Sequence, residues 1–491
     1  MERYILGLDL IDALIDGSLS DAMERRWLQV QARSQLLVPE TTVAGVHVQR
    51  RHDGAELSSW LTLLSQLDRL PSPAVSEVYD DDPLLHGERA AAHCLGLRIL
   101  CCDPQSDDGL DLYRPLGLVS SLPPQSIPFL DLKARFFAAP GLLSQALLAA
   151  AASGWYVLGE AVNRFEEAWA DYLDVPWAVG VSNGLDGLHI ALRALGVGKG
   201  DEVVVPSNTY IATWLAVTFT GARPIPAEPD PPTMVLEAAG IEAALCERSK
   251  AVIPVPLYGH PCNMPAIMHL AEKRGLFVVE DNAQAQGAAW RGQKTGTFGH
   301  LNATSLYPGK NLGALGDAGI LSGTDERYRQ HVRRLRNYGS TRKYYNEEYG
   351  FNARLDELQA AVLLPQLQLL DAQNERRREI AGRYSAALAG VGDLELPTAA
   401  PGATHVWHQY VVRSPRREDL MYFLQQQGVG TLLHYPVPPH LQQAYRRFGY
   451  KAGDFPVAED IANRCLSLPI DPTLGDPAID RVAELIHDFF A

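Results

Sequence analysis

The stretch Ala303-Thr-Ser-Leu-Tyr-Pro-Gly-Lys-Asn-Leu-Gly-Ala-Leu-Gly-Asp-Ala-Gly319 decides how the middle of the chain folds. Its first part, Thr304–Tyr307, is typical of a short buried strand that ends at Pro308-Gly309. Lys310 follows on the turn, and the three glycines after it predict a tight loop instead of a helix. A lysine held still and partly desolvated on such a turn suits Schiff-base chemistry with a carbonyl, whereas a solvated loop lysine is the ordinary alternative.

Length and composition are those of a globular protein. The 491 residues allow about three domains. The net charge of -15, from 43 basic and 58 acidic residues, weighs against bulk binding of nucleic acid or acidic membranes. Six cysteines without metal-site spacing, and no segment resembling a signal peptide, predict reduced thiols and a cytoplasmic location.

One uncharged segment, Phe136–Gly159, has to be weighed as a membrane span. Proline, glycine and polar residues interrupt it, and its alanine-rich middle is only modestly hydrophobic. A spanning helix needs about 20 predominantly apolar residues. We therefore expect a buried or packed helix over Leu142–Ala152 and no membrane partner.

The first part of the chain, residues 1–122, predicts a separate small α/β domain. Strand-like apolar runs occur at Tyr4–Leu8, Leu36–Pro39 and Leu97–Cys102, and helix-like runs lie between them. A proline-rich linker, Gly117–Pro128, leads out of this domain.

Acidic residues stand near the expected ends of these elements and could hold a divalent metal. They are Asp9, Asp12, Asp80, Asp81, Asp82 and Asp103. The layout resembles a PIN-type nuclease domain, but that family's Asp-x-Asn opening is not clean here, and Gly45 stands where its glutamate is expected. A degenerate accessory domain with solvated aspartates is the alternative.

The middle of the chain alternates continuous apolar runs with helical patterns. This alternation predicts a mostly parallel seven-stranded sheet with helices on both faces. The expected strands are Trp177–Val181, Glu202–Pro206, Arg223–Ala227, Ala251–Leu257, Leu276–Glu280, Thr304–Tyr307 and Gly319–Ser322. The expected helices include Gly187–Leu195, Ile211–Thr218 and Met264–Lys273. In such sheets ligands bind beyond the carboxyl ends of the strands.

A long helical pattern follows over Asp356–Ala387, and Pro365 inside it predicts a kink or a break. Shorter elements come next, including a strand at Gln409–Arg413 and a helix at Arg417–Gln426. They predict a small C-terminal α+β domain. The expected domains are therefore residues 1–122, 127–380 and 381–491.

Residues just past the expected strands share a chemical theme. Ser182–Gly187 opens a helix with small residues, whose free amides and positive dipole attract phosphate, although an ordinary helix cap has the same composition. Tyr210 adds an aromatic ring and Asp281 a carboxylate. The sixth strand supplies Ser305 and then Lys310.

These groups together fit pyridoxal 5′-phosphate (PLP). PLP needs a lysine for its aldehyde, a carboxylate that keeps the pyridine nitrogen protonated, a stacking ring and a phosphate cup. Each group alone has an ordinary structural explanation. Their joint occurrence, each at a strand end, favours a PLP site and predicts no metal there.

Several long segments match one known family. They are Gly154-Trp-Tyr-Val-Leu-Gly159, Gly200-Asp-Glu-Val-Val-Val-Pro206, Leu257-Tyr-Gly259, Glu280-Asp-Asn-Ala-Gln-Ala285, Tyr307-Pro-Gly-Lys-Asn-Leu-Gly313, Gly350-Phe-Asn-Ala-Arg-Leu-Asp356, His434-Tyr-Pro-Val-Pro438 and Leu466-Ser-Leu-Pro469. On these segments the chain, from Ile127 to its C-terminus, closely resembles the sugar-nucleotide aminotransferases of the DegT group. The resemblance implies an α/β protein of the fold-type I class of PLP-dependent transferases.

The same resemblance implies individual roles. Lys310 would form the Schiff base with PLP and move a proton between cofactor and sugar, and Asp281 would pair with the pyridine nitrogen. Further cofactor contacts would come from Gly184, the amide of Leu185, Tyr210, Gln284, Ser305 and Asn352. Gly184, Leu185 and Ser305 would hold the phosphate. Tyr210 would stack on the pyridine ring, and Gln284 would contact the ring hydroxyl. Asn352 would reach the phosphate in a neighbouring subunit, which implies a homodimer with shared active sites.

One departure from the family concerns Leu185, where threonine is usual. A backbone amide survives this change and a hydroxyl contact does not, so we expect somewhat weaker phosphate binding. Related dehydratases carry histidine in place of the lysine. Because Lys310 is present here, transamination is favoured.

A locally basic run precedes an aromatic pair and suits a sugar-nucleotide diphosphate. We prefer Arg342 and Lys343, with Tyr344 beside them, although a solvated surface is an alternative for the preceding arginines. The segments around Tyr344 and His434 look most like the branch that aminates C3 of dTDP-3-keto-6-deoxyhexoses. There Tyr307, His434 and Tyr435 would line the sugar pocket and L-glutamate would donate the amine, while His434 as a packing residue is the alternative.

Two other functions remain as hypotheses. One is a regulatory or binding protein that keeps the PLP fold without turnover, against which the retained Lys310 and Asp281 argue. The other is a bifunctional protein whose N-terminal domain is a metal-dependent nuclease.

Overall fold

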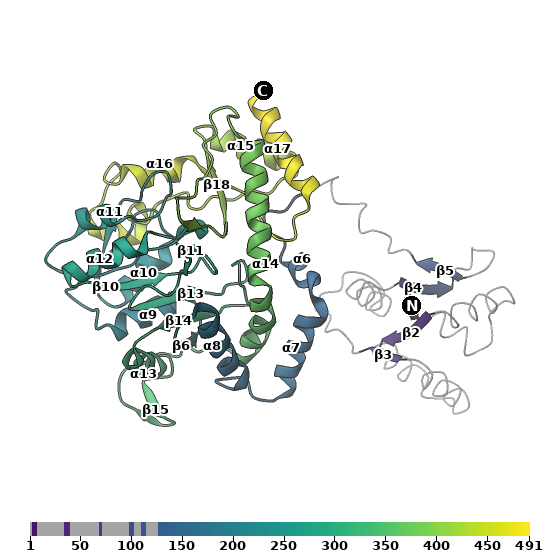
Figure 1. The fold of residues 1–491 in the computed structure, drawn as a ribbon, viewed down its shortest axis with the longest axis horizontal. Coiled ribbons are helices and arrows are strands. Elements are labelled where there is room, and N and C mark those ends of the chain that lie inside the picture. Colours follow the sequence, from purple (N-terminus) through teal and green to yellow (C-terminus); the bar gives the residue numbers. More distant parts are fainter. Residues whose placement is uncertain (1, 7–33, 40–67, 71–97, 103–109, 114–125) are drawn as a thin grey trace. The chain divides into compact units, whose positions relative to one another are not determined.

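The structure, a computed structural model, describes residues 2–6, 34–39, 68–70, 98–102, 110–113 and 126–491 (Figure 1). The chain divides into two compact units, Met1–Pro124 and Gln125–Ala491, which are described separately below.

The N-terminal unit contains a five-stranded sheet in the order β3-β2-β1-β4-β5. Its strands are β1 (Glu2–Leu6), β2 (Ser34–Pro39), β3 (Asp68–Leu70), β4 (Arg98–Cys102) and β5 (Leu110–Tyr113). The first four run parallel, and β5 pairs antiparallel with β4. The aspartates of the predicted acidic cluster lie outside the described residues, so the PIN-like interpretation stays a prediction.

A seven-stranded sheet forms the centre of the second unit, in the order β6-β14-β13-β10-β9-β7-β8. Its strands are β6 (Trp177–Val181), β7 (Glu202–Pro206), β8 (Arg223–Ala227), β9 (Ser249–Val252), β10 (Phe277–Asp281), β13 (Leu301–Ser305) and β14 (Gly319–Gly323). Only β14 runs against the others, which confirms the predicted mostly parallel sheet. The fully buried strands β6 and β7 show why their sequences are continuously apolar.

Helices flank this sheet and continue into a second core (Figure 1). The helices before the second core are α6 (Leu132–Ala138), α7 (Pro140–Ala152), α8 (Glu160–Leu173), α9 (Gly184–Ala194), α10 (Ile211–Phe219), α11 (Ala238–Ala244), α12 (Met264–Arg274), α13 (Glu326–Leu335) and α14 (Glu357–Ala387). The second core contains the end of α14 with β18 (Tyr410–Arg413), β19 (Cys465–Leu468), α15 (Arg417–Gln426) and α17 (Asp476–Phe490), while α16 (Pro456–Arg464) contacts β18.

Two strand predictions were partly wrong, for reasons that concern polar and cyclic residues. The strand before Lys310 is Leu301–Ser305 instead of Thr304–Tyr307, because the buried amide of Asn302 is satisfied by the backbone of Ser322 and Gly299 and so fits a central strand. The strand expected at Ala251–Leu257 ends at Val252, since two prolines follow that have no N–H to donate.

The sequence predicted a kink or a break at Pro365, and the break was wrong. Helix α14 continues through it as one element, from the neighbourhood of α7 and α8 to that of α17 (Figure 1). Proline in a helix interior costs about 3 kcal/mol. Leu363, Leu367 and Leu370 are buried around the proline, and this packing offsets the lost hydrogen bond.

The uncharged segment Phe136–Gly159 forms the end of α6 and the whole of α7, while the first part of α6 carries Lys133 and Arg135. Considered singly, every helix in the described part of the chain is too short or too polar to cross a bilayer. Taken together, α6 and α7 are long and apolar enough for a membrane span by length and composition alone. Their axes, however, are bent by 89° relative to each other. Helix α7 packs against α14, as expected, but Leu142 and Leu148 on it stay exposed.

Glu357 on α14 fixes the start of helix α8. Its carboxylate accepts hydrogen bonds from the backbone N–H groups of Gly159, Ala161 and Val162, at 2.8 to 2.9 Å. These are donors that the first turn of a helix leaves without intrahelical partners. The Glu357 side chain therefore joins α8 to α14, and its negative charge interacts favourably with the positive end of the α8 dipole.

We predict that Glu357→Ala lowers the free energy of unfolding by about 2–4 kcal/mol, because three largely buried N–H groups lose a charged acceptor. Urea denaturation followed by circular dichroism measures the change. Glu375→Ala is the matched control on the same helix, since Glu375 is exposed and pairs only with Arg378, and we expect less than about 0.5 kcal/mol there. Equal losses in the two variants would contradict this role of Glu357.

Candidate active site

Functional side chains meet at one edge of the large sheet. Strands β6, β7, β10 and β13 run in the same direction, so the residues that follow them lie at their common carboxyl edge. Asp281 ends β10 and pairs across the sheet with Ala303 of β13. This register brings the turn that follows β13, with Lys310 on it, just beyond Asp281.

A small cradle forms where helix α9 begins. The side chain of Asn183 caps the helix by accepting from the N–H of Asp186 at 2.8 Å. A Cβ on Gly184 would come within 2.6 Å of the Cβ of Ser305, so only glycine allows this close approach. Free amides and the positive helix end therefore lie beside the Ser305 hydroxyl, which suits a phosphate.

Leu185 contributes to this cradle through its backbone only. Its side chain is partly buried and packs against the main hydrophobic core. The helix nevertheless begins three residues earlier than the sequence predicted, because Asn183 supplies the cap.

Asp281 and Lys310 shift each other's ionisation. The Asp281 side chain is buried and accepts a hydrogen bond from the Thr213 hydroxyl at 2.8 Å. Burial raises the pKa of Asp281, while the hydrogen bonds from Thr213 and the Ala283 N–H and the positive charge of Lys310 act in the opposite direction. Burial lowers the pKa of Lys310 to about 8, and the charge of Asp281 partly offsets this shift.

Gln284 is oriented from both ends. Its carbonyl accepts from the N–H of Tyr258 at 2.7 Å, and its amide donates to the Tyr435 hydroxyl at 2.9 Å. The Tyr435 ring lies 5.1 Å from the ring of Tyr210, with a tilt of 38°. Tyr435, from the C-terminal part of the chain, therefore contacts both Tyr210 after β7 and Gln284 after β10.

His434 lies close to the same group. Burial, and then the charge of Lys310, lower the pKa of His434 to about 4, so the ring is neutral at physiological pH. Its Nδ1 is 2.8 Å from the Ser467 hydroxyl. Tyr307 stays exposed at the outer side of the turn. Both the substrate-pocket and the packing interpretation of His434 are compatible with these contacts.

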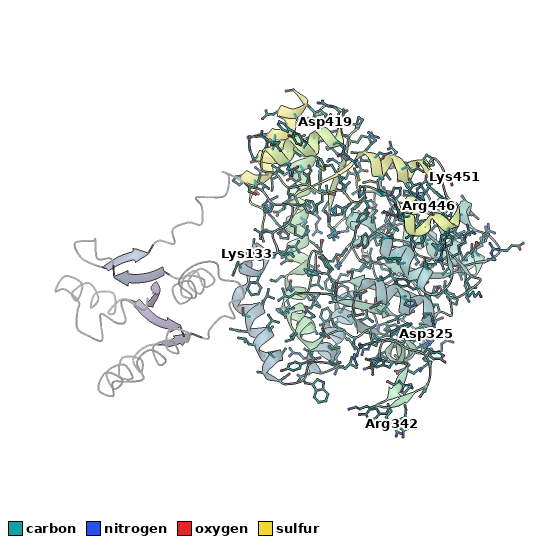
Figure 2. The ribbon with its side chains drawn as sticks, turned by 180° about the vertical axis from the view of Figure 1, so that it is seen from behind. Lys133, Asp325, Arg342, Asp419, Arg446 and Lys451 are labelled. Carbon is teal, nitrogen blue, oxygen red and sulfur yellow. The ribbon has the colours of Figure 1, made fainter. Side chains whose placement is uncertain are left out.

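The predicted nucleotide-binding residues lie elsewhere in the single chain. Arg342, Lys343 and Tyr344 belong to a hairpin of β15 (Ser340–Arg342) and β16 (Tyr345–Asn346), and Figure 2 shows Arg342 at its outer end. Arg342 lies 3.8 Å from the centre of the Tyr345 ring. Asn352 is also exposed and pairs with Asn337 near this hairpin. Within one chain, the described interactions thus do not join these residues to Lys310.

Sequence reasoning missed residues that orient the site without entering it. Thr213 bonds Asp281, and its position one helical turn after Tyr210 is the signal that could have found it. Asn311, next to Lys310, donates to Asn374 and to the carbonyl of Val406, at 2.8 and 3.1 Å. That contact joins the turn to α14 and leaves no local sequence signal.

The residues present fit PLP. Asp281 is a buried carboxylate whose raised pKa is relieved by a cation such as a pyridinium N–H. Lys310 is an amine with a substantial neutral fraction near neutral pH. The approach of Gly184 to Ser305 forms the phosphate cradle, and Tyr210 offers an aromatic face.

Comparison with known proteins agrees with the fold and the site. The family model of the DegT/DnrJ/EryC1/StrS aminotransferases matches residues 142–487. A dTDP-3-amino-3,4,6-trideoxy-alpha-D-glucose transaminase of Streptomyces venezuelae is 46% identical over 363 residues, which cover 74% of this chain and 96% of that protein. A dTDP-3-amino-3,6-dideoxy-alpha-D-galactopyranose transaminase of Aneurinibacillus thermoaerophilus is 44% identical over 363 residues, with 74% and 99% covered.

A solved structure matches equally well. The crystal structure of S. venezuelae DesV superposes with a TM-score of 0.73 at 46% identity and covers 74% of this chain and 98% of that one. The predicted fold-type I architecture is thereby confirmed. About a quarter of the chain lies outside these matches, and the family model begins after the N-terminal unit.

The lowered pKa of Lys310 predicts how the apoprotein captures PLP. Only the neutral amine attacks an aldehyde, so the capture rate should rise about tenfold per pH unit up to about pH 8 and level off above it. Stopped-flow absorbance from pH 6 to 10 measures this rate. An inflection near 10.5, the ordinary value for lysine, would contradict the lowered pKa of Lys310.

Proposed function

The chain belongs to the DegT/DnrJ/EryC1/StrS aminotransferase family, and we propose that it transfers the amino group of L-glutamate to C3 of a dTDP-3-keto-6-deoxyhexose. The chain is a PLP-dependent aminotransferase of nucleotide sugars. The proposal adds the donor, the sugar, the aminated carbon and the residues that perform the reaction.

One observation carries the assignment of residues. The partly neutral amine of Lys310 and the buried carboxylate of Asp281 share one strand edge with the cradle between Gly184 and Ser305. The cradle would hold the phosphate of PLP, Asp281 would pair with its pyridine nitrogen, and Lys310 would bond its aldehyde. This supports Lys310 as the proton-carrying residue.

When bound, PLP supplies an electrophilic aldehyde and a ring that withdraws electrons from the carbon being deprotonated. Lys310 takes a proton at Nζ from one carbon and returns it to another, which its pKa near 8 permits in both directions. Asp281 would pair with the pyridine nitrogen of bound PLP, and Thr213 holds the carboxylate in place. Over both half-reactions glutamate exchanges its amine for the oxygen of the keto-sugar, so no external oxidant is required.

The choice of sugar rests on relatives and on local residues. The Streptomyces and Aneurinibacillus relatives are named for dTDP-linked 3-amino sugars, and this chain is at least 44% identical to both. His434 is neutral and lies near Lys310, where an uncharged ring suits a deoxy-sugar more than a carboxylated one. Tyr307 and Tyr435 would line the remainder of the sugar pocket.

We propose a homodimer in which each hairpin serves the neighbouring site. Arg342, Lys343 and Tyr344 lie exposed on the hairpin and would contact the diphosphate of a nucleotide bound to the other copy. Exposed apolar side chains on and after helix α7, including Leu148, Trp155 and Tyr156, offer a surface for that copy. Asn352 would reach the partner's phosphate cradle in the same arrangement.

The assignment of Lys310 is tested by cofactor absorbance. The purified protein with PLP should develop the visible absorbance of a lysine-bound cofactor and lose it on addition of glutamate. Lys310→Ala should show neither change, because no amine remains to bond the aldehyde. Lys294→Ala is the matched control, since the Lys294 amine contacts the carbonyl and ring of Tyr172 instead, and it should behave as the wild type. Visible absorbance that persists in Lys310→Ala would contradict the assignment.

The sugar is tested with a panel of keto-sugar nucleotides. The PLP enzyme is incubated with glutamate and dTDP- or UDP-linked sugars that carry a keto group at C3 or C4. We expect mass spectrometry to detect amination of the dTDP-3-keto-6-deoxy compounds, and NMR to place the amine on C3. A product aminated at C4, or turnover of UDP sugars alone, would contradict the proposed substrate.

Shared sites predict complementation between two inactive variants. Lys310→Ala lacks the reacting amine, and the double variant Arg342→Ala/Lys343→Ala lacks the hairpin charges. In a mixed dimer, one of the two sites keeps both the Lys310 amine and the hairpin charges. Random assortment makes about half of the dimers mixed, so mixtures reassembled after mild denaturation should regain up to about a quarter of wild-type activity. Mixtures that stay inactive, with mixed dimers shown by native mass spectrometry, would contradict sharing.

A further inference from the structure

The turn that carries Lys310 is held from behind by a residue that lies 175 positions earlier in the chain. Arg135, on helix α6, donates from one guanidinium nitrogen to the backbone carbonyl of Lys310 at 3.0 Å. The same nitrogen lies 3.5 Å from the carbonyl of Pro308. One side chain thus holds the backbone on both sides of the tight turn.

Arg135 is itself fixed by a buried carboxylate. Its Nε donates to Asp471 at 2.5 Å, and a guanidinium nitrogen of Arg377 lies 3.7 Å from the same oxygen. The second oxygen of Asp471 accepts from the N–H and hydroxyl of Thr473. The two arginines keep the pKa of Asp471 below its usual value despite burial, so the carboxylate stays charged.

This arrangement has little freedom to move. The side chains of Arg377 and Asp471 are 1% and 6% exposed, and Arg377 also donates to the carbonyl of Ile470 at 2.7 Å. Removing one member of a buried charged group leaves the others uncompensated, so displacement is costly. The guanidinium of Arg135 is therefore presented to the turn in a single orientation.

The segment that leads to Arg135 belongs to the C-terminal core. The N–H and carbonyl of Ile127 bond Gly428 and Gly430, both at 2.8 Å. Asn311 anchors the other side of the turn to α14, as described above. The backbone of Lys310 is thereby clamped between two elements that are remote in sequence.

We propose that Arg135 is a positioning residue for Lys310, which it aims at the reacting carbon by holding the carbonyls of Pro308 and Lys310. This role rests on the proposed function of Lys310. A lysine side chain on a free turn samples many directions, and misplacement of a reacting group by about 1 Å can cost about a hundredfold in rate. Arg135 acts on the orientation of the amine and makes no contact with substrate.

The test uses the full-length PLP enzyme and three variants. Arg135→Met removes the donors but keeps the apolar stem, and Arg135→Lys restores one donor without the forked geometry. Arg376→Met is the matched control, because Arg376 on helix α14 pairs with Asp476 at the surface and its described contacts do not include the turn. The readouts are the visible circular dichroism of bound cofactor and the rate of its absorbance change with glutamate.

We expect Arg135→Met to weaken the cofactor's circular dichroism and to slow the change at saturating glutamate about tenfold or more. The half-saturating glutamate concentration should move less than about twofold, and Arg135→Lys should recover part of the rate. Arg376→Met should match the wild type within about twofold. A folded Arg135→Met with wild-type dichroism and rate, or a loss no larger than in Arg376→Met, would overturn the proposal.

Asp471→Asn covers the case in which Arg135→Met does not fold. This substitution preserves the shape of the side chain and removes the charge that orients Arg135. We therefore expect a smaller loss of rate at saturating glutamate than in Arg135→Met, with little change in the half-saturating glutamate concentration. An unchanged rate and spectrum would overturn the role of Arg135. A wild type that develops no Lys310-dependent absorbance would instead overturn the proposed function itself, so the two failures are distinct.

Discussion

The mutual influence of Asp281 and Lys310 is the interaction on which the rest of the site depends. Burial disfavours the charge of each, and each stabilises the charge of the other. Neither residue alone would be poised for proton transfer, because an isolated buried carboxylate takes up a proton and an isolated buried amine loses one. Their pairing leaves the pKa of Lys310 at about 8, where the amine both gives and accepts a proton near neutral pH.

The sheet makes this pairing possible at a tolerable cost in stability. Asp281 and the turn after β13 are fixed by the parallel register of β10 and β13, whose strands are almost completely buried. Polar groups at such a place need partners, and Thr213 supplies one for Asp281. The glycine at position 184 then lets α9 approach closely enough to place its amides next to Ser305.

Local sequence was sufficient to propose the residues that would carry the chemistry. Tyr210 follows and Asp281 ends a mainly apolar strand, whereas Ser305 and Lys310 come from the more polar strand β13 and its turn. The direction of the parallel strands places all of them at one edge. Two boundaries were missed where a central strand contains a buried amide, as at Asn302, or where prolines end it early. The break expected at Pro365 was overruled by packing on both sides of it, which no local pattern records.

Residues that orient the site could not be found in this way. Tyr258 and Asn311 act through hydrogen bonds between segments that lie apart in the chain. Such a contact leaves no periodic pattern and no characteristic spacing, because its geometry exists only after the two cores have docked. The sequence motifs therefore reveal which reaction the chain performs, while the contacts that hold the Lys310 turn depend on the fold of the whole second unit.

The basic residues of the β15–β16 hairpin are the opposite case, in which the sequence singles out residues that lie away from Lys310 in the single chain. The sequence predicts Arg342 and Lys343 as anion-binding residues, and in the folded chain they lie over tyrosine rings of their own hairpin at the surface. A basic side chain resting on an aromatic face is kept extended and only weakly neutralised, so it remains available to a phosphate. The proposed amine chemistry and the proposed nucleotide binding therefore involve different parts of the fold, the turn after β13 and the β15–β16 hairpin.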